Sequence, residues 1–182
     1  MILSDIIKSR IVEEFNIWKD IQYAGKDKTA RSKLGAFFTP PPLSIKMLEK
    51  FDSLNGNILD PTLGAGGLLA AAVLAGADPA KCYGIELDSD ILKIAQLRLA
   101  KLGVPPWHLK QGDALDPSSY EFEDKDNAKQ FAVVAKFKDY VKLIVVSKSR
   151  LVKEVNFTGR TKDKLKITLQ KLKEKKLKIV KL

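Results

Sequence analysis

The sequence predicts an α/β protein with a parallel sheet, and three segments support this class. Residues 57–69 read as a short apolar strand, a glycine-rich turn and the start of an Ala/Leu-rich helix that Gly76 ends. Residues 82–88 form a second apolar strand that ends in acids, and an amphipathic helix follows. Residues 109–111 read as a third short strand. Strands that alternate with helices are typical of βαβ units and a parallel sheet.

The length and composition set limits on the class of protein. The chain has 182 residues, which suits one domain of ordinary size with room for a small appendage. It has no run of about 18 apolar residues and no visible signal peptide. We therefore expect a soluble, cytoplasmic protein without membrane contact. Cys82 is the only cysteine, which excludes an internal disulfide and a cysteine zinc site, and we expect it in the core.

The positive charge is concentrated in the last third of the chain. The net charge is +10, with 32 Lys and Arg against 22 Asp and Glu, and all of the excess follows residue 120. A basic segment indicates a phosphate-rich partner such as DNA. A Lys-rich solvated face would give the same pattern, and the sequence does not separate the two interpretations.

The order of segments predicts three parts: a helical extension over residues 1–34, the α/β domain over 35–135 and a basic segment over 136–182. Apolar positions at helical spacing over residues 2–24 predict an amphipathic helix that packs on the domain. Residues 43–51 predict another helix, with Ser44 as its candidate cap.

Two aromatic residues and Thr39 precede three prolines, which force an extended segment. One of Phe37 and Phe38 is expected to pack in the core. The other, with Thr39, is expected to form a wall of a ligand pocket.

The glycine-rich turn predicts a cradle for a nucleotide-type cofactor. Gly64, Gly66 and Gly67 allow positive φ or a ligand against bare backbone, and the next helix directs its free N–H groups toward that ligand. Asp60 ends the preceding strand and would repel a pyrophosphate but hold an ammonium group. S-adenosylmethionine (SAM) has an ammonium, a carboxylate and a cationic sulfonium, so the turn favours SAM over NAD. The third glycine of G-x-G-x-x-G is replaced by Leu69.

Two later acids complete this predicted site. Glu86 ends the second strand about 20 residues beyond the glycines, where a doubly wound fold places a carboxylate on ribose hydroxyls. Asp88 is better explained as the N-cap of a helix over residues 89–102. Asp113 follows the third strand and can accept a hydrogen bond from an adenine amino group. His108 has no His or Cys neighbour, so we expect a surface or core position without a metal.

Four ordered motifs resemble the SAM-binding half of adenine-specific (N6) DNA methyltransferases, such as the modification subunits of type I restriction systems. They are Gly-Ala-Phe-Phe-Thr-Pro-Pro, Leu-Asp-Pro-Thr-Leu-Gly-Ala-Gly-Gly, Tyr-Gly-Ile-Glu-Leu-Asp and Gln-Gly-Asp-Ala-Leu, all within residues 34–115. The resemblance implies a Rossmann-like SAM-dependent methyltransferase sheet. The cofactor-binding residues that it implies are Phe38, Thr39, Asp60, Thr62, Gly64, Gly66, Glu86 and Asp113.

One family motif is absent from this sequence. Family members carry an Asn/Asp-Pro-Pro-Tyr/Phe loop after a fourth strand, and this loop accepts hydrogen bonds from the flipped target base. Residues 116–120 read as a turn, and the expected strand over 131–134 is followed by Ala-Lys-Phe-Lys. A lysine side chain only donates hydrogen bonds, so it cannot replace this acceptor. We therefore assign no catalytic residue and expect methyl transfer to DNA only with a partner chain that supplies the loop and target recognition.

Residues 139–182 alternate apolar and Lys-rich positions. Period two predicts strands in an antiparallel meander, with turns near residues 158–160 and 174–175. Leu165, Leu169 and Leu172 also fit a helix. The alternative function is a non-catalytic SAM- or nucleic-acid-binding module. A third is a methyltransferase for another acceptor, with a different catalytic loop.

Overall fold

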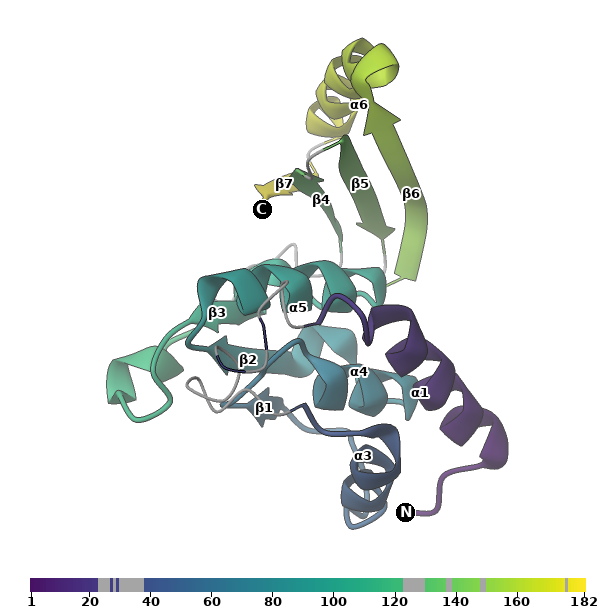
Figure 1. Ribbon diagram of the computed structural model, residues 1–182, viewed down its shortest axis with the longest axis vertical. Helices are drawn as coiled ribbons and strands as arrows, with labels where there is room; N and C mark the ends of the chain where they lie inside the picture. Colours follow the sequence, from purple (N-terminus) through teal and green to yellow (C-terminus); the bar gives the residue numbers. More distant parts are fainter. Residues whose placement is uncertain are drawn as a thin grey trace.

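The computed structural model has an α/β fold with two sheets, and α5 lies between them (Figure 1). Helices cover one side of a parallel sheet, which confirms the predicted α/β class. None of the described helices is long and apolar enough to cross a membrane. The structure describes residues 1–22, 27, 29, 38–122, 130–136, 139–147, 150–175 and 177–182.

The first sheet contains the three predicted strands in the order β1-β2-β3, all parallel. Strand β1 spans Ile58–Asp60, β2 spans Cys82–Glu86 and β3 spans Leu109–Gln111. Helix α4 (Gly67–Leu74) joins β1 to β2, and α5 (Ser89–Lys101) joins β2 to β3.

Asp88 and Cys82, beside and within this sheet, lie as the sequence predicts. The Asp88 carboxylate accepts hydrogen bonds from the backbone N–H groups of Asp90 and Ile91, which confirms the predicted N-cap of α5. Cys82 is fully buried, as predicted, and burial raises the pKa of its thiol to about 12. His108 is also buried, and its ring stacks on Tyr83 with the ring centroids 4.4 Å apart.

Two helices precede the first sheet. Helix α1 spans Asp5–Trp18, and α3 spans Pro41–Leu48. The prediction that Ser44 caps α3 is wrong, because the helix begins earlier, with Pro40 as its N-cap residue. Proline suits this first turn because its missing N–H would have no helical partner there. Ser44 lies buried inside the helix, and its hydroxyl donates to the carbonyl of Pro40.

The second sheet has the strand order β6-β5-β4-β7. Strands β5 (Tyr140–Ser147) and β6 (Arg150–Thr158) pair antiparallel, as the predicted meander requires. Strand β4 (Gln130–Lys136), which lies outside the predicted meander, also pairs antiparallel with β5. The meander prediction fails beyond this point. Helix α6 (Lys162–Glu174) follows, and β7 (Lys178–Lys181) returns parallel to β4.

The strand predicted over residues 131–134 is present as β4, but it pairs with β5 and β7 and does not join the first sheet. Its residues Phe131–Val134 are buried because α5 packs on one face and α6 on the other. The division of the chain at residues 34 and 135 stays a prediction.

Single turns of 3-10 helix connect several of these elements. One of them, Pro117–Tyr120, confirms the predicted turn over residues 116–120, where the Asp116 carboxylate accepts from the N–H of Ser118. These turns are Pro79–Lys81, Pro106–His108, Pro117–Tyr120 and Gly159–Thr161.

A buried ion pair joins the N-terminal helix α1 to helix α5. The side chain of Arg98, on α5, is almost fully buried, and its Nε donates to Glu14 Oε1 at 2.7 Å. A second nitrogen of the same guanidinium donates to Glu14 Oε2, which makes the pair bidentate. The third donates to the carbonyl of Ala65 at 3.2 Å. One side chain therefore connects α1, α5 and the glycine-rich turn.

This arrangement predicts a large loss of stability for Glu14→Ala. The substitution leaves the guanidinium of Arg98 buried without a counter-charge, which typically costs about 3–5 kcal/mol. Urea unfolding followed by circular dichroism measures the free energy of unfolding.

Glu13→Ala is the matched control, because Glu13 is the exposed neighbour on the same helix and its carboxylate accepts from the Ser9 hydroxyl. We expect a change within about 0.5 kcal/mol for this control. Similar losses for the two variants would show that the buried pair contributes little.

Candidate cofactor site

The carboxyl ends of the three parallel strands bring the predicted acids to one edge of the first sheet. Asp60 ends β1 and is in register with Gly84, and Glu86 ends β2 and is in register with Gln111. Asp113 lies two residues beyond the end of β3. Open α/β sheets bind their ligands at this edge. These acids are far apart in the sequence, but the parallel strands place them at neighbouring strand ends.

The glycine-rich turn lies between β1 and α4 and is held by β2. The N–H of Leu63 donates to the carbonyl of Ile85 at 2.9 Å. Gly64 has a φ of +52°, and Gly66, the N-cap residue of α4, has a φ of +76°. The α4 N–H groups at this end have no helical partner, so they are available to an anionic group.

Phe38 packs directly on this turn. A Cβ atom added to Gly64 would lie 2.7 Å from Cε1 of the Phe38 ring, so the ring rests on bare backbone. This contact brings together Phe38 and Gly64, which the sequence separates by 25 intervening residues. Thr39 follows in the same extended segment and is partly buried. Phe37, the other aromatic residue of the pair, lies outside the described residues.

Glu86 organises the turn. One carboxylate oxygen accepts from the N–H of Gly64 at 2.7 Å, and the other accepts from the N–H of Asp88 at 2.9 Å. Sequence reasoning expected this acid to face a ribose. The structure shows that it connects the end of β2 to the glycine-rich turn, and the ribose contact stays a prediction. Each carboxylate oxygen keeps further acceptor capacity, because one N–H uses only part of it.

Asp60 lies where its charged form is disfavoured. Burial raises its pKa above the ordinary value of 3.8, and the negative charge of Glu86 raises it further. The N–H of Thr62 opposes this effect by donating to Asp60 Oδ1 at 3.1 Å. An ionised carboxylate in this position is costly without a counter-charge. The site can therefore gain free energy from a cationic group beside Asp60.

The remaining predicted residues lie at the rim. Asp113 is exposed, and its carboxylate accepts from the N–H of Leu115 at 2.8 Å. This hydrogen bond stabilises the turn after β3 and occupies part of the acceptor capacity that a ligand would use. Thr62 is exposed, and its contribution is the backbone donation to Asp60.

Arg98 is the residue of this site that the sequence analysis missed. Its guanidinium supports the turn from behind through the carbonyl of Ala65, and a Cβ added to Gly67 would lie 3.5 Å from Nη1. The available signal was an arginine between Leu97 and Leu99, on a helix whose neighbouring positions are apolar. Such a position predicts a buried cation that needs a partner.

A parallel βαβαβ unit with a glycine-rich turn and three acids at its carboxyl edge has the layout of an α/β ligand-binding domain, because open sheets bind their ligands at this edge. The family model described as N-6 DNA Methylase matches residues 22–167, which is most of the chain. The chain therefore belongs to the N-6 DNA methylase family. Membership of a methyltransferase family implies dependence on SAM in general terms.

A curated relative supports the methyltransferase assignment. A tRNA (guanine(10)-N2)-dimethyltransferase from Pyrococcus abyssi (strain GE5 / Orsay) is 35% identical over 74 residues. These residues are 41% of this chain but only 22% of the relative, so the match spans about a fifth of that protein. This similarity supports a methyltransferase in general terms, but it does not identify the molecule that accepts the methyl group.

The contact between Phe38 and Gly64 predicts a thermodynamic coupling between the two residues. Gly64→Ala should destabilise the chain through the clash with the Phe38 ring. In the Phe38→Ala background, the cost of Gly64→Ala should fall by about 1 kcal/mol, because the obstructing ring is gone. Urea unfolding of the four proteins gives the coupling free energy.

Gly66→Ala is the control for this cycle, because its added Cβ would meet Leu99 instead. Its cost should be the same with and without Phe38. A coupling that is equal for Gly64 and Gly66 would contradict the specific packing of Phe38 on Gly64.

The raised pKa of Asp60 predicts a pH-dependent effect of Asp60→Asn. Below the ordinary value of 3.8 the carboxyl is protonated in both folded and unfolded chains, so the substitution should change little. The wild-type carboxyl becomes costly as the pH rises from 3.8 through its raised folded pKa. The stability advantage of Asp60→Asn should therefore appear over this window and stay constant above it.

Urea unfolding of both proteins across a pH series measures the difference in unfolding free energy. The variant keeps a side-chain oxygen for the N–H of Thr62, so loss of that hydrogen bond does not confuse the comparison. A stability difference that shrinks with rising pH would contradict the direction of the pKa shift.

Proposed function

We propose that this chain binds SAM at the glycine-rich turn and is the cofactor-binding part of an adenine-N6 DNA methyltransferase in the cytoplasm, of the kind found in restriction-modification systems. The observation that carries this proposal is the grouping of Asp60, Glu86 and Asp113 around a positive-φ glycine-rich turn. We also propose that the first sheet is a Rossmann-like methyltransferase sheet. Family membership supports the methyltransferase part of it.

The residues of the site fit the chemical groups of SAM. Asp60 would hold the ammonium group, which removes the cost of its buried negative charge. The N-terminus of α4, at Gly66, would face the carboxylate. Glu86 would accept from the ribose hydroxyls with the acceptor capacity that Gly64 and Asp88 leave. When bound, SAM supplies an activated methyl group.

Three further residues would complete the binding site. Phe38 would form an apolar wall beside the turn, with Thr39 next to it. Asp113 would accept a hydrogen bond from the adenine amino group, which requires its present turn bond to the N–H of Leu115 to be shared or released. Thr62 would position Asp60 through its backbone N–H.

Methyl transfer to DNA requires a partner chain in this proposal. The sequence contains no Asn/Asp-Pro-Pro-aromatic loop, and Lys136, which ends β4, offers only donors. The position of β4 in the second sheet also supports this view, because its end is not part of the acidic edge of the first sheet.

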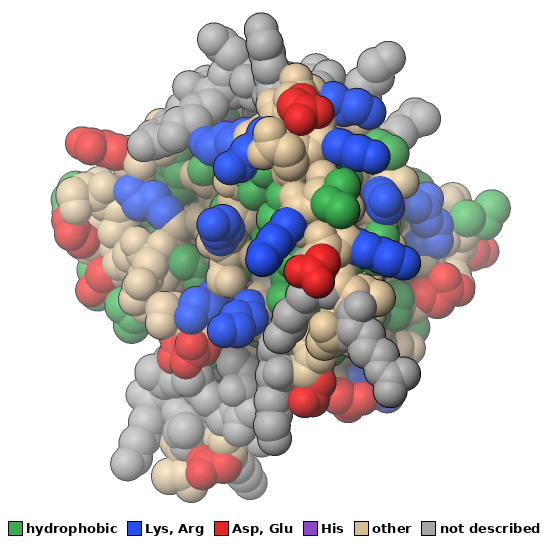
Figure 2. Space-filling view, turned by 90° about the horizontal axis from the view of Figure 1, so that it is seen from above, with side chains coloured by type: hydrophobic (Ala, Val, Ile, Leu, Met, Phe, Trp, Pro, Cys, Tyr) green, Lys and Arg blue, Asp and Glu red, His purple; other side chains and the backbone are tan. Residues whose placement is uncertain are grey.

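The alternative is a non-catalytic module that binds SAM or nucleic acid. A basic surface favours nucleic acid as one ligand. Figure 2 shows Lys and Arg side chains gathered on the end of the molecule that carries the second sheet and α6. Exposed lysines on α6 contribute to this basic surface: Lys164, Lys166, Lys171 and Lys173.

Isothermal titration calorimetry with SAM tests the proposed site. Wild-type chain should bind SAM, and Asp60→Asn should weaken binding by about tenfold or more through loss of the charge pair. Asp113→Ala should weaken it to a smaller extent. Asp116→Ala is the matched control, since Asp116 is an exposed acid on the same loop that contacts Ser118 instead.

Absence of SAM binding, or equal affinities for wild type and Asp60→Asn, would contradict the cofactor assignment. Transfer of a labelled methyl group to DNA by the isolated chain would contradict the requirement for a partner.

The basic surface predicts salt-dependent binding to DNA. Replacing Lys164 and Lys171 with glutamine should weaken binding at low salt. Each lost phosphate contact should reduce the slope of log affinity against log salt by about 0.9. Fluorescence anisotropy with a labelled duplex measures both quantities. Lys46→Gln with Lys50→Gln is the control, because these residues belong to the α3 region; an equal effect there would indicate only a non-specific dependence on net charge.

A further inference from the structure

Helix α1 carries apolar side chains on two faces, and the rest of the described structure covers only one of them. Ile11 and Trp18 are buried where the helix packs on the fold. Ile6 and Ile17 are 75% and 66% exposed. Figure 1 shows α1 along the outside of the molecule, next to α4 and α3. A single exposed isoleucine is ordinary, but two on one outer face indicate a contact surface.

The outer face of α1 has a regular pattern of four exposed residues. They follow one another at spacings of four, three and four positions: Ile6, Arg10, Glu13 and Ile17. Residues at these spacings lie on one side of a helix. The same alternation of three and four forms the seam through which two helices pack in a coiled coil. We call these four residues the α1 seam, which is apolar at both ends and oppositely charged in the middle.

The α1 seam is symmetric about the middle of the helix. Ile6 is the second residue of α1, and Ile17 is the second from its end. Arg10 and Glu13 are likewise equally far from the two ends. When two identical helices lie antiparallel with their middles aligned, each Ile6 faces Ile17 of the other copy. Each Arg10 then faces Glu13 of the other copy. This self-complementary pattern is what a two-fold interface between identical chains requires.

The two charges decide the direction of the second helix. A parallel pair would place Arg10 against Arg10 and Glu13 against Glu13, and facing like charges are destabilising. An antiparallel pair gives two Arg–Glu ion pairs beside the two-fold axis. Charged residues within such a seam also fix its register, since a shifted pair would leave them opposite isoleucine.

The same pattern favours a second copy of this chain over a foreign helix. A foreign partner needs only to complement the α1 seam, whereas a second copy needs a seam that complements itself. Residues 1–120, which include α1, contain 14 Lys and Arg and 14 Asp and Glu, so this part carries no net charge. Two copies therefore meet at α1 without the repulsion that the basic segment would impose.

We propose that the chain forms a homodimer in which two copies of α1 pack antiparallel through the α1 seam. Ile2 and Ile21 flank the helix, are 91% and 45% exposed, and extend the apolar contact beyond its ends. The ion pair of Glu14 with Arg98 holds the inner side of α1, so association orders little of the chain. A single helix per copy gives a small interface, and we expect a weak, concentration-dependent dimer.

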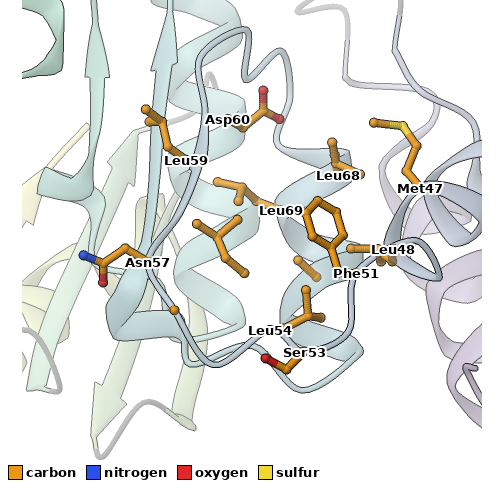
Figure 3. Close-up of a pocket in the computed structure, with 13 residues that line it drawn as sticks. Met47, Leu48, Phe51, Ser53, Leu54, Asn57, Leu59, Asp60, Leu68 and Leu69 are labelled. Atoms are coloured by element: carbon orange, nitrogen blue, oxygen red, sulfur yellow. The ribbon is translucent and has the colours of Figure 1, made fainter. Parts of the chain in front are cut away.

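Another apolar region among the described residues lies apart from the α1 seam and supplies a control. It is a hollow of about 370 Å³, and its lining residues fall between positions 47 and 72. Figure 3 shows Met47, Phe51 and Leu68 around this space, with Asp60 at its edge. Met47 is 40% exposed. A change at Met47 therefore alters an exposed apolar residue without touching α1.

Sedimentation equilibrium of the full chain tests the proposal. Wild type should show a reversible monomer–dimer equilibrium over about a hundredfold range of concentration. Arg10→Glu places two acids opposite each other at both central positions of the dimer. It should raise the dissociation constant by about tenfold or more. Glu13→Arg should have the same effect, because it places two arginines opposite each other.

A mixture of these two weakened chains should recover the dimer. The Arg10→Glu chain presents only acids in the middle of the seam, and the Glu13→Arg chain presents only arginines. An equimolar mixture should therefore form a heterodimer about as tightly as wild type dimerises. The chain that carries both substitutions has the ion pair reversed and should dimerise alone.

Two controls separate the seam from general effects. Lys46→Glu, at an exposed position on α3, changes the net charge by the same amount as Arg10→Glu and should leave the dimer intact. Ile17→Asp should dissociate the dimer, whereas Met47→Asp should not. Circular dichroism checks that each variant is folded, which the exposure of the substituted side chains favours.

Cysteine cross-linking measures the direction of the pair. Oxidation of a mixture of Ile6→Cys and Ile17→Cys chains should give the mixed disulfide in about fivefold excess over either symmetric one, because only facing positions are close enough to bridge. Cys82 does not compete, since it is buried with a pKa of about 12. An excess of the symmetric disulfides would contradict the antiparallel arrangement.

Several results would overturn the homodimer. The chain would stay monomeric throughout the concentration range, Lys46→Glu would weaken the dimer as much as Arg10→Glu, or the mixed chains would fail to associate. A monomeric chain that binds phosphatidylcholine vesicles through Ile6 and Ile17 would also overturn it, because the seam would then face a membrane surface. None of these measurements involves SAM, so the homodimer and the proposed function stand or fall separately.

Discussion

The buried guanidinium of Arg98 is the constraint on which the rest of the structure depends. It binds Glu14 on the N-terminal helix through two nitrogens and Ala65 in the glycine-rich turn through the third. A buried cation of this kind is stable only when its donors are satisfied, so α1, α5 and the turn must assemble together. The N-terminal helix is therefore part of the support of the candidate site, although it contributes no side chain to the predicted ligand contacts.

Two acids at the edge of the first sheet have different roles: Glu86 holds the backbone of the glycine-rich turn, and Asp60 carries a charge that its surroundings disfavour. Glu86 uses both carboxylate oxygens to hold backbone N–H groups, which keeps the turn in shape before any ligand arrives. Asp60 receives one backbone N–H and has a raised pKa because of its burial. The first acid supplies rigidity, while the second stores an unfavourable charge that a cation can relieve.

Local pattern predicted much of the fold, and long-range pairing explains what it missed. The three parallel strands, their connecting helices and the cap at Asp88 follow from nearby residues, because periodicity and capping act within a few positions. Strand β4 joins the second sheet in part because it pairs with β7, almost fifty residues later in the chain. An alternation of period two identifies a strand but does not say which strand it pairs with. In α6, Leu165, Leu169 and Leu172 pack on the second sheet at helical spacing, so tertiary contact decided between two local readings. The role of Arg98 likewise depends on Glu14, 84 positions away.

Helix α5 belongs to two hydrophobic cores at once. Leu92, Ala95 and Leu99 pack toward the first sheet, whereas Leu97 and Ala100 pack with Phe131 and Ile144 of the second. The salt bridge from Glu154 on β6 to Lys101 on α5 reinforces this second contact, and Lys142 on the neighbouring strand β5 also pairs with Glu154. Removing the basic segment would uncover an apolar stripe on the very helix that carries Arg98. The two sheets thus share α5 as a packing surface. Loss of the second sheet would therefore destabilise the helix that supports the glycine-rich turn through Arg98.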